Sequence, residues 1–247
     1  MKYDFVTNNN PGLGDCLSVF TTSLPVYSPS PHFKILKKYS SLNVFRGEGI
    51  ALRTELLHGK HVGQHLFNKA RIEAGDSPLE NPRPILDKIE YKPKKEIVCF
   101  SFDVGAVVTQ QRETLHPRAR MLYPEYRDLF QKFISDHPDI KFVEIGQKCF
   151  NFKGVDSIVG QGLEKTISLL SESGKFICMT SGLQHLSLAI GVPTCAIVNF
   201  PHPEKFMSST EQETDWLEPQ VVYLHEDGFS DKVEQVSTDS LEKFLIE

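Results

Sequence analysis

Residues 175–198 hold the segment whose residue types best suit the binding of a phosphate. They read KFICMTSGLQHLSLAIGVPTCAIV, in which a short apolar strand ends in Thr180, Ser181 and Gly182. A helix that carries His185 follows. In open α/β sheets, ligands bind where the carboxyl end of a strand meets the start of a helix. Free N–H groups and the helix dipole favour an anion there, small residues let it approach the main chain, and a hydroxyl adds a donor.

The same residues also have purely structural interpretations. Thr180 or Ser181 could cap the helix, and capping uses the same geometry as phosphate binding, so the two roles are compatible. A helical histidine such as His185 is commonly packed or solvated. Its place at the carboxyl end of a strand gives a binding role equal weight.

A second chemical signal is the glycine loop PGLGD at residues 11–15. Gly12 and Gly14 permit a tight turn from a first strand into a helix, and Asp15 stands near the start of that helix. Aspartate is a preferred N-cap residue, and a lone glycine-rich turn is a weak signal, so these residues alone favour the capping role. In a cleft, the carboxylate of Asp15 could instead act as a general base that takes a proton from an attacking hydroxyl.

A third signal is the basic cluster of His116, Arg118 and Arg120, in the loop between a buried strand and the next helix. Cations in this loop would face the same crevice as the phosphate-binding segment. Arginine favours bidentate contacts with phosphate. The alternative is a solvated basic loop.

Composition places the chain among soluble globular proteins, with 40% apolar and 24% charged residues in a length of 247. A formal net charge of −5 gives no attraction for nucleic acid or for an anionic membrane. We expect no transmembrane segment, because no apolar run approaches the roughly 20 residues that a span needs. The N-terminus lacks a signal-peptide pattern, so we expect a cytoplasmic protein.

The five cysteines are odd in number and show no C-x-x-C spacing. Cys99, Cys178 and Cys195 lie inside apolar runs. We therefore expect buried free thiols in a reducing compartment, and no zinc site.

The elements that position these residues alternate between strands and helices, which predicts a parallel α/β layout. Strands are expected at 3–7, 25–28, 96–102, 141–145, 175–179, 194–198 and 221–224. Helices are expected at 15–24, 33–42, 61–74, 124–137, 162–173, 182–190 and 238–246. Residues 43–60 fit neither pattern.

Residues 75–95 carry four prolines and several charges, which is typical of a linker. We therefore predict a small N-terminal α/β domain at 1–93. A Rossmann-like domain with a sheet of four to five strands follows at 94–247. The last helix could pack back on the first domain.

Three segments together resemble glycosyltransferase family 9, the ADP-heptose:lipopolysaccharide heptosyltransferases and their relatives. Residues 180–194, TSGLQHLSLAIGVPT, resemble the family's D-[ST]-G-x-x-H-[LI]-x-x-A-x-x-x-P-T stretch. The segment at residues 12–25, GLGDCLSVFTTSLP, resembles the family's G-[DE] opening. The segment at residues 118–130, RARMLYPEYRDLF, resembles the family's basic residue that precedes a [WY]-P pair. Thr180 departs from the family's Asp, Arg120 stands one position from its Lys, and residues 1–93 are shorter than its acceptor domain.

The resemblance implies a GT-B fold of two Rossmann-like domains with parallel sheets, the first one small. It implies an inverting, metal-independent glycosyltransferase that moves a heptose-like sugar or a hexose from a nucleotide-diphosphate sugar to an acceptor hydroxyl, as in lipopolysaccharide biosynthesis. Asp15 would be the base. The donor would be held by Thr180, Ser181, Gly182, His185, Arg118 and Arg120, beside the glycine loop of Gly12 and Gly14.

By the same resemblance, the donor is a substrate and no cofactor or metal is needed, and the absence of a D-x-D motif agrees with this. The acceptor could be a saccharide, a lipid-linked molecule or a protein, and peripheral membrane contact is compatible with it. Two alternatives stay open: a GT-B-type nucleotide-sugar epimerase or hydrolase, and a non-catalytic nucleotide-sugar-binding protein. The donor base, its sugar, the acceptor and the oligomeric state are not determined by these residues.

Overall fold

A seven-stranded sheet forms the centre of the larger part of the molecule. The computed structural model describes residues 4–6, 12–22, 31–42, 49–51, 67–68, 70–72, 75–79, 83–103, 124–179, 181–198, 220–225 and 228–246. The sheet comprises β3 (Lys94–Ser101), β4 (Lys141–Gly146), β5 (Asp156–Val159), β6 (Ser173–Met179), β7 (Thr194–Val198), β8 (Gln220–His225) and β9 (Gly228–Gln235). Its order is β5-β4-β3-β6-β7-β8-β9. The first five strands are parallel, while β8 and β9 are antiparallel to their neighbours.

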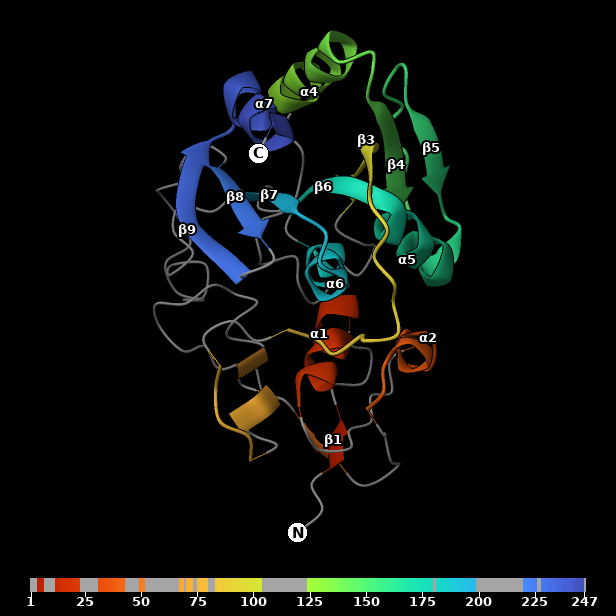
Figure 1. Ribbon diagram of the computed structural model, residues 1–247, viewed down its shortest axis with the longest axis vertical. Helices are drawn as coiled ribbons and strands as arrows, with labels where there is room; N and C mark the ends of the chain where they lie inside the picture. The colour runs from red at the N-terminus through yellow and green to blue at the C-terminus, as the bar shows by residue number, and fades with distance from the viewer. Residues whose placement is uncertain are drawn as a thin grey trace.

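Helices cover both faces of this sheet, as Figure 1 shows. The helices α5 (Gly162–Glu172) and α6 (Gly182–Ile190) lie on one face. The helices α4 (Pro124–Asp136) and α7 (Thr238–Ile246) lie together on the other. The strand side chains alternate between these two layers, and in β3 Cys99 faces α5 while Val98 and Phe100 face α4. Burial on both faces explains why the central strands read as continuous apolar runs.

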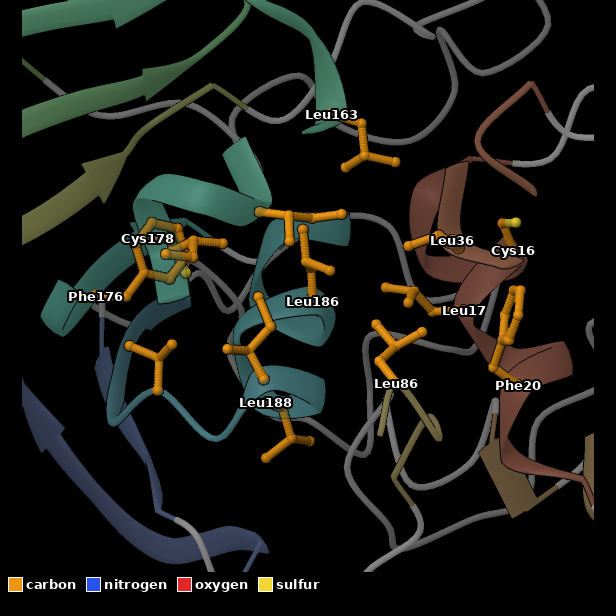
Figure 2. Close-up of a cluster of buried hydrophobic side chains, with 14 of the residues drawn as sticks. Cys16, Leu17, Phe20, Leu36, Leu86, Leu163, Phe176, Cys178, Leu186 and Leu188 are labelled. Atoms are coloured by element: carbon orange, nitrogen blue, oxygen red, sulfur yellow. The ribbon is translucent and has the colours of Figure 1, made fainter. Parts of the chain in front are cut away.

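The N-terminal elements lie at one end of the molecule (Figure 1). The strand β1 (Asp4–Val6) pairs in parallel with β2 (Gly49–Ala51). The helix α1 (Leu13–Ser18) continues into η1 (Val19–Thr21), and α2 (Phe33–Leu36) continues into η2 (Lys37–Tyr39). These helices share one hydrophobic cluster with α5, α6 and the sheet. Figure 2 shows part of it, with Leu17, Leu86 and Leu186 among the buried side chains.

The proline-rich segment is irregular, as predicted, but it is anchored to both parts of the chain. The main-chain N–H of Ile85 donates a hydrogen bond to Phe20 O at 2.7 Å. The N–H of Lys92 donates another to Ser171 O at 2.8 Å. Leu86 is only 4% exposed and belongs to the shared cluster. This segment therefore packs as part of the core and connects the N-terminal elements with the larger sheet. The predicted domain boundary at residue 93 stays a prediction.

Most predicted elements in the described residues are confirmed, but the predicted sheet of four to five strands is too small. The pattern missed β5 and β9, which are the two edge strands of the sheet. Asp156 and Ser157 of β5 are exposed, and β9 reads GFSDKVEQ. Charged residues on edge strands prevent pairing with other chains and also remove the apolar signal on which prediction depends.

Smaller differences concern the helices. The helix predicted at 33–42 already ends with η2 at Tyr39. Within 61–74 the described residues 67–68 and 70–72 are helical, and the strand predicted at 25–28 lies outside the described residues. The last helix packs beside α4, where Lys175 of β6 donates a hydrogen bond to Phe244 O.

The thiols follow the sequence prediction. Cys16, Cys99, Cys178 and Cys195 are buried and free, and Cys149 is free and exposed. Burial raises the pKa of Cys99 to about 11, and it also raises the pKa of Cys178 and Cys195. In the part of the chain that the structure describes, no helix is both long and apolar enough to cross a membrane.

Two leucines of the proline-rich segment test its role in the core. We expect Leu86→Ala to lower the free energy of unfolding by about 2–4 kcal/mol, because it leaves a cavity in the shared hydrophobic cluster. Leu79 is 46% exposed, so Leu79→Ala should change the free energy of unfolding by less than about 0.5 kcal/mol. Urea unfolding of both variants measures the difference, and equal small effects would show that the segment is a loose linker.

Candidate functional site

The strand order of the sheet reverses beside β3, and this reversal locates the candidate site. The chain leaves β3 to form β4 and β5 on one side, and then crosses over to form β6 and β7 on the other. In such sheets the crevice for a ligand opens at the carboxyl ends of the strands on either side of the reversal, here β3 and β6. The junction of β6 and α6 lies at this point, as the sequence predicted.

The segment predicted to be a basic loop follows β3 in the chain, one of the two strands at the reversal. It begins after Asp103 and ends before α4. Its residues His116, Arg118 and Arg120 lie outside the described residues, as does Thr180 at the end of β6.

Ser181 is the N-cap of α6, which confirms its structural interpretation. Its backbone is extended, with φ −156°, and its Oγ accepts a hydrogen bond from Leu183 N–H at 3.3 Å. Its carbonyl oxygen accepts another from Gln184 N–H at 3.2 Å. Ser181 and Gly182 are half-buried, so a ligand can reach them. Because the hydroxyl accepts in its capping role, its proton remains able to bind an anion.

Asp15 lies inside the first turn of α1, so the prediction that it caps this helix is wrong. Gly12 O accepts the hydrogen bond of Cys16 N–H at 3.0 Å, and α1 begins at Leu13. The residue whose carbonyl accepts the first helical bond is the N-cap, which makes Gly12 the cap and Asp15 the third helical residue. The side chain of Asp15 is outside the described part of the structure, and its role as a base stays a prediction.

The amino ends of α1 and α6 meet through two glycines that are far apart in the sequence. A Cβ atom on Gly182 would lie 2.7 Å from Leu13 Cβ and 2.9 Å from Gly14 N. A Cβ atom on Gly14 would lie 3.0 Å from His185 Cδ2. The two segments that the sequence singled out for chemistry are therefore in direct contact, and the main chains approach this closely because both positions are glycine.

His185 lies behind this glycine contact. It is 6% exposed, and its ring packs near edge-on against Phe67, with 5.2 Å between the ring centroids. This packing agrees with the structural interpretation of the histidine. Its role in donor binding stays a prediction.

Sequence reasoning missed two polar groups, one that follows β3 and one within β4. Asp103 Oδ2 accepts hydrogen bonds from Gln147 N–H at 2.8 Å and Lys148 N–H at 3.0 Å. Glu144 is 1% exposed, and its carboxylate accepts from Phe150 N–H at 2.7 Å. Both carboxylates fix the loop that follows β4. An acidic residue immediately after a buried strand, as at Asp103, is the signal that could have found the first.

The candidate site offers hydroxyl and N–H donors at the amino ends of two helices. This set suits an anion, and a phosphate in particular. Among the described residues, no three His, Cys, Asp or Glu side chains lie together in a way that could hold a metal ion.

No family model matches the chain, and no curated protein matches it in sequence. Several solved structures match its fold. The E. coli heptosyltransferase WaaC with ADP-2-deoxy-2-fluoro heptose aligns with a TM-score of 0.56 at 10% identity, over 99% of each chain. WaaC with ADP gives a TM-score of 0.52 at 10% identity, over 78% of this chain and 86% of that one.

A further match is TibC, an iron-containing dodecameric glycosyltransferase of enterotoxigenic E. coli H10407. It has a TM-score of 0.54 at 17% identity, over 87% of this chain and 61% of TibC. This chain thus spans about three fifths of TibC. The matches show that the chain has the α/β GT-B fold of these glycosyltransferases, which confirms the predicted fold class.

The contact between the two glycines can be tested by adding a single methyl group. We expect Gly182→Ala to lower the free energy of unfolding by about 1–3 kcal/mol, because its Cβ meets main-chain and Cβ atoms of α1. Gly14→Ala should lower the free energy of unfolding by less, because the nearest atom to its new Cβ belongs to the His185 ring and not to the main chain. Thermal or urea unfolding measures both. If the two helices did not touch, both substitutions would be neutral or stabilising, since alanine favours a helix over glycine.

Proposed function

We propose that the chain is an inverting glycosyltransferase that moves a heptose-like sugar or a hexose from a nucleotide-diphosphate sugar to an acceptor hydroxyl. The observation that carries the proposal is the contact of Gly14 with the start of α6. It puts the first turn of α1, which bears Asp15, against a helix end that suits a diphosphate. The chain shares its fold with glycosyltransferases whose structures contain ADP or an ADP-heptose.

In this proposal the donor diphosphate lies at the start of α6. It accepts hydrogen bonds from the Ser181 hydroxyl and from first-turn N–H groups, beginning with that of Gly182. Thr180, Arg118 and Arg120 complete the site in this proposal, since Thr180 follows β6 in the chain and the two arginines lie between β3 and α4. His185 lines its inner side. Residues 94–247 would hold the donor and residues 1–93 would contribute the acceptor side.

The reaction is a single displacement at the anomeric carbon. Asp15 takes the proton of the acceptor hydroxyl, the acceptor oxygen forms a bond to that carbon, and the bond from the carbon to the diphosphate oxygen breaks. The electron pair leaves with the nucleoside diphosphate. Attack from the face opposite the leaving group inverts the configuration.

The main electrostatic task is to stabilise the charge that develops on the leaving diphosphate. We assign this task to the amino end of α6 and to the two arginines, without a metal ion or an organic cofactor. Such an enzyme would work in the cytoplasm, where its five free cysteines stay reduced.

Replacement of the base separates transfer from binding. We expect Asp15→Asn to lower kcat by about 10²–10⁴-fold, because the acceptor hydroxyl loses its proton acceptor, while the donor Kd stays within about twofold. The measurement combines donor titration with a transfer assay. Asp128→Asn, at an exposed position of α4, is the matched control and should keep full activity.

The same assay distinguishes the alternatives. Donor turnover without any acceptor would favour an epimerase or hydrolase. Donor binding by the parent chain with no turnover under any acceptor condition would contradict transfer and favour a binding protein.

A charge at the N-cap of α6 tests the diphosphate site without loss of the cap. Aspartate caps a helix as well as serine does, so Ser181→Asp should keep the melting temperature. Its carboxylate should repel the diphosphate and weaken nucleotide binding by about tenfold or more. Gln161→Asp adds the same charge at the N-cap of α5 and is the matched control. Equal nucleotide affinity of the two variants would show that the diphosphate binds elsewhere.

A further inference from the structure

Gln184 is a buried polar residue whose side chain is not satisfied by the fold. It lies in the first turn of α6 and is 5% exposed. Within the described part of the structure, its Oε1 is buried and accepts no hydrogen bond. Its main chain is paired, because its N–H donates to Ser181 O at 3.2 Å and its carbonyl accepts from Ser187 Oγ at 2.8 Å.

Ser187 and Thr194, two other buried polar residues of this region, are paired with each other. Ser187 Oγ accepts a hydrogen bond from Thr194 Oγ1 at 2.7 Å, and both residues are fully buried. A buried acceptor without a donor destabilises the folded state, and almost all such groups in proteins find a partner. An apolar side chain of similar volume would fill the same space without this penalty. The fold alone therefore does not explain a glutamine at position 184.

Gln184 stands three residues after the N-cap of α6, and general helix geometry relates its side chain to the first turn. In a helix the Cα–Cβ bonds tilt toward the amino end, and long side chains lie over the preceding turn. For Gln184 that turn begins at Ser181, the N-cap of α6. The adjoining Gly182 touches Gly14, which is the neighbour of Asp15 in the chain.

We propose that Gln184 Oε1 accepts a hydrogen bond from a hydroxyl group of the sugar that is transferred, and that Gln184 selects the donor sugar. This inference rests on the proposed function. A diphosphate has no hydrogen to donate, so it cannot satisfy a carbonyl oxygen. The donor carries hydroxyls on its ribose and on the transferred sugar. The transferred sugar is the part that must lie beside Asp15, at the end of α6 that Gly14 contacts.

Calorimetric titration of the full chain tests the proposal. The probes are ADP-, GDP-, UDP- and dTDP-sugars together with the corresponding free nucleoside diphosphates. In Gln184→Met, which keeps the volume and removes the acceptor, the Kd of the preferred sugar nucleotide should rise about tenfold. The Kd of its free nucleoside diphosphate should change less than twofold. The melting temperature without ligand should stay equal or rise, because the unsatisfied oxygen is gone.

Ser187→Ala is the matched control. It removes a buried hydrogen bond one turn further along α6 and should lower the melting temperature, but it should leave both affinities unchanged. If Gln184→Met does not fold, Gln184→Leu supplies the same comparison with a more common core residue.

Three results would overturn the proposal. An unchanged affinity of Gln184→Met for the sugar nucleotide would exclude the contact. An equal loss for the sugar nucleotide and the free diphosphate would place Gln184 on the nucleotide. A clear fall in the melting temperature of both Gln184→Met and Gln184→Leu without ligand would show that the oxygen has a structural partner. Failure of the parent chain to bind any of the probes would instead refute the proposed function, and the inference with it.

Discussion

The close approach of α1 and α6 is the constraint on which the rest of the molecule depends. Gly14 and Gly182 let the two main chains touch. The Cβ atom of Leu13 occupies the place that a side chain at position 182 would need. Behind this contact, Leu17 and Leu186 belong to one hydrophobic cluster that continues to the central sheet. The same steric fit thus joins the N-terminal elements to the sheet and aligns the two helix ends that carry the candidate chemistry.

The sheet decides where this contact lies. Because β4 and β6 pair on opposite sides of β3, the strand order reverses at this point, which is where open α/β sheets bind their ligands. The phenylalanine-rich layer on the opposite face, which includes Phe100, Phe102 and Phe130, packs edge-to-face and fixes β3 against α4. A rigid sheet and a capped helix end give a ligand a preorganised set of donors.

The sequence predicted the central strands and the helices beside them because burial on two faces leaves long apolar runs and clear helical periodicity. It did not predict the edge strands β5 and β9, whose polar residues protect the sheet edges. The early start of α1 was missed because the cap is a glycine that acts through its carbonyl. The contact of Gly14 with α6 could not be predicted, because it depends on the steric fit between segments that meet only in the folded chain. The unsatisfied oxygen of Gln184 is a property of three-dimensional packing in the same way.

The central claim is that one donor molecule binds where the amino ends of α1 and α6 meet. Hydrogen–deuterium exchange of the full chain, with and without a saturating nucleotide-diphosphate sugar, tests this claim most directly. We expect slower exchange in residues 12–18 and 181–190 together, since the ligand would contact both helix ends. Protection confined to one of these segments, or found only elsewhere in the chain, would contradict it.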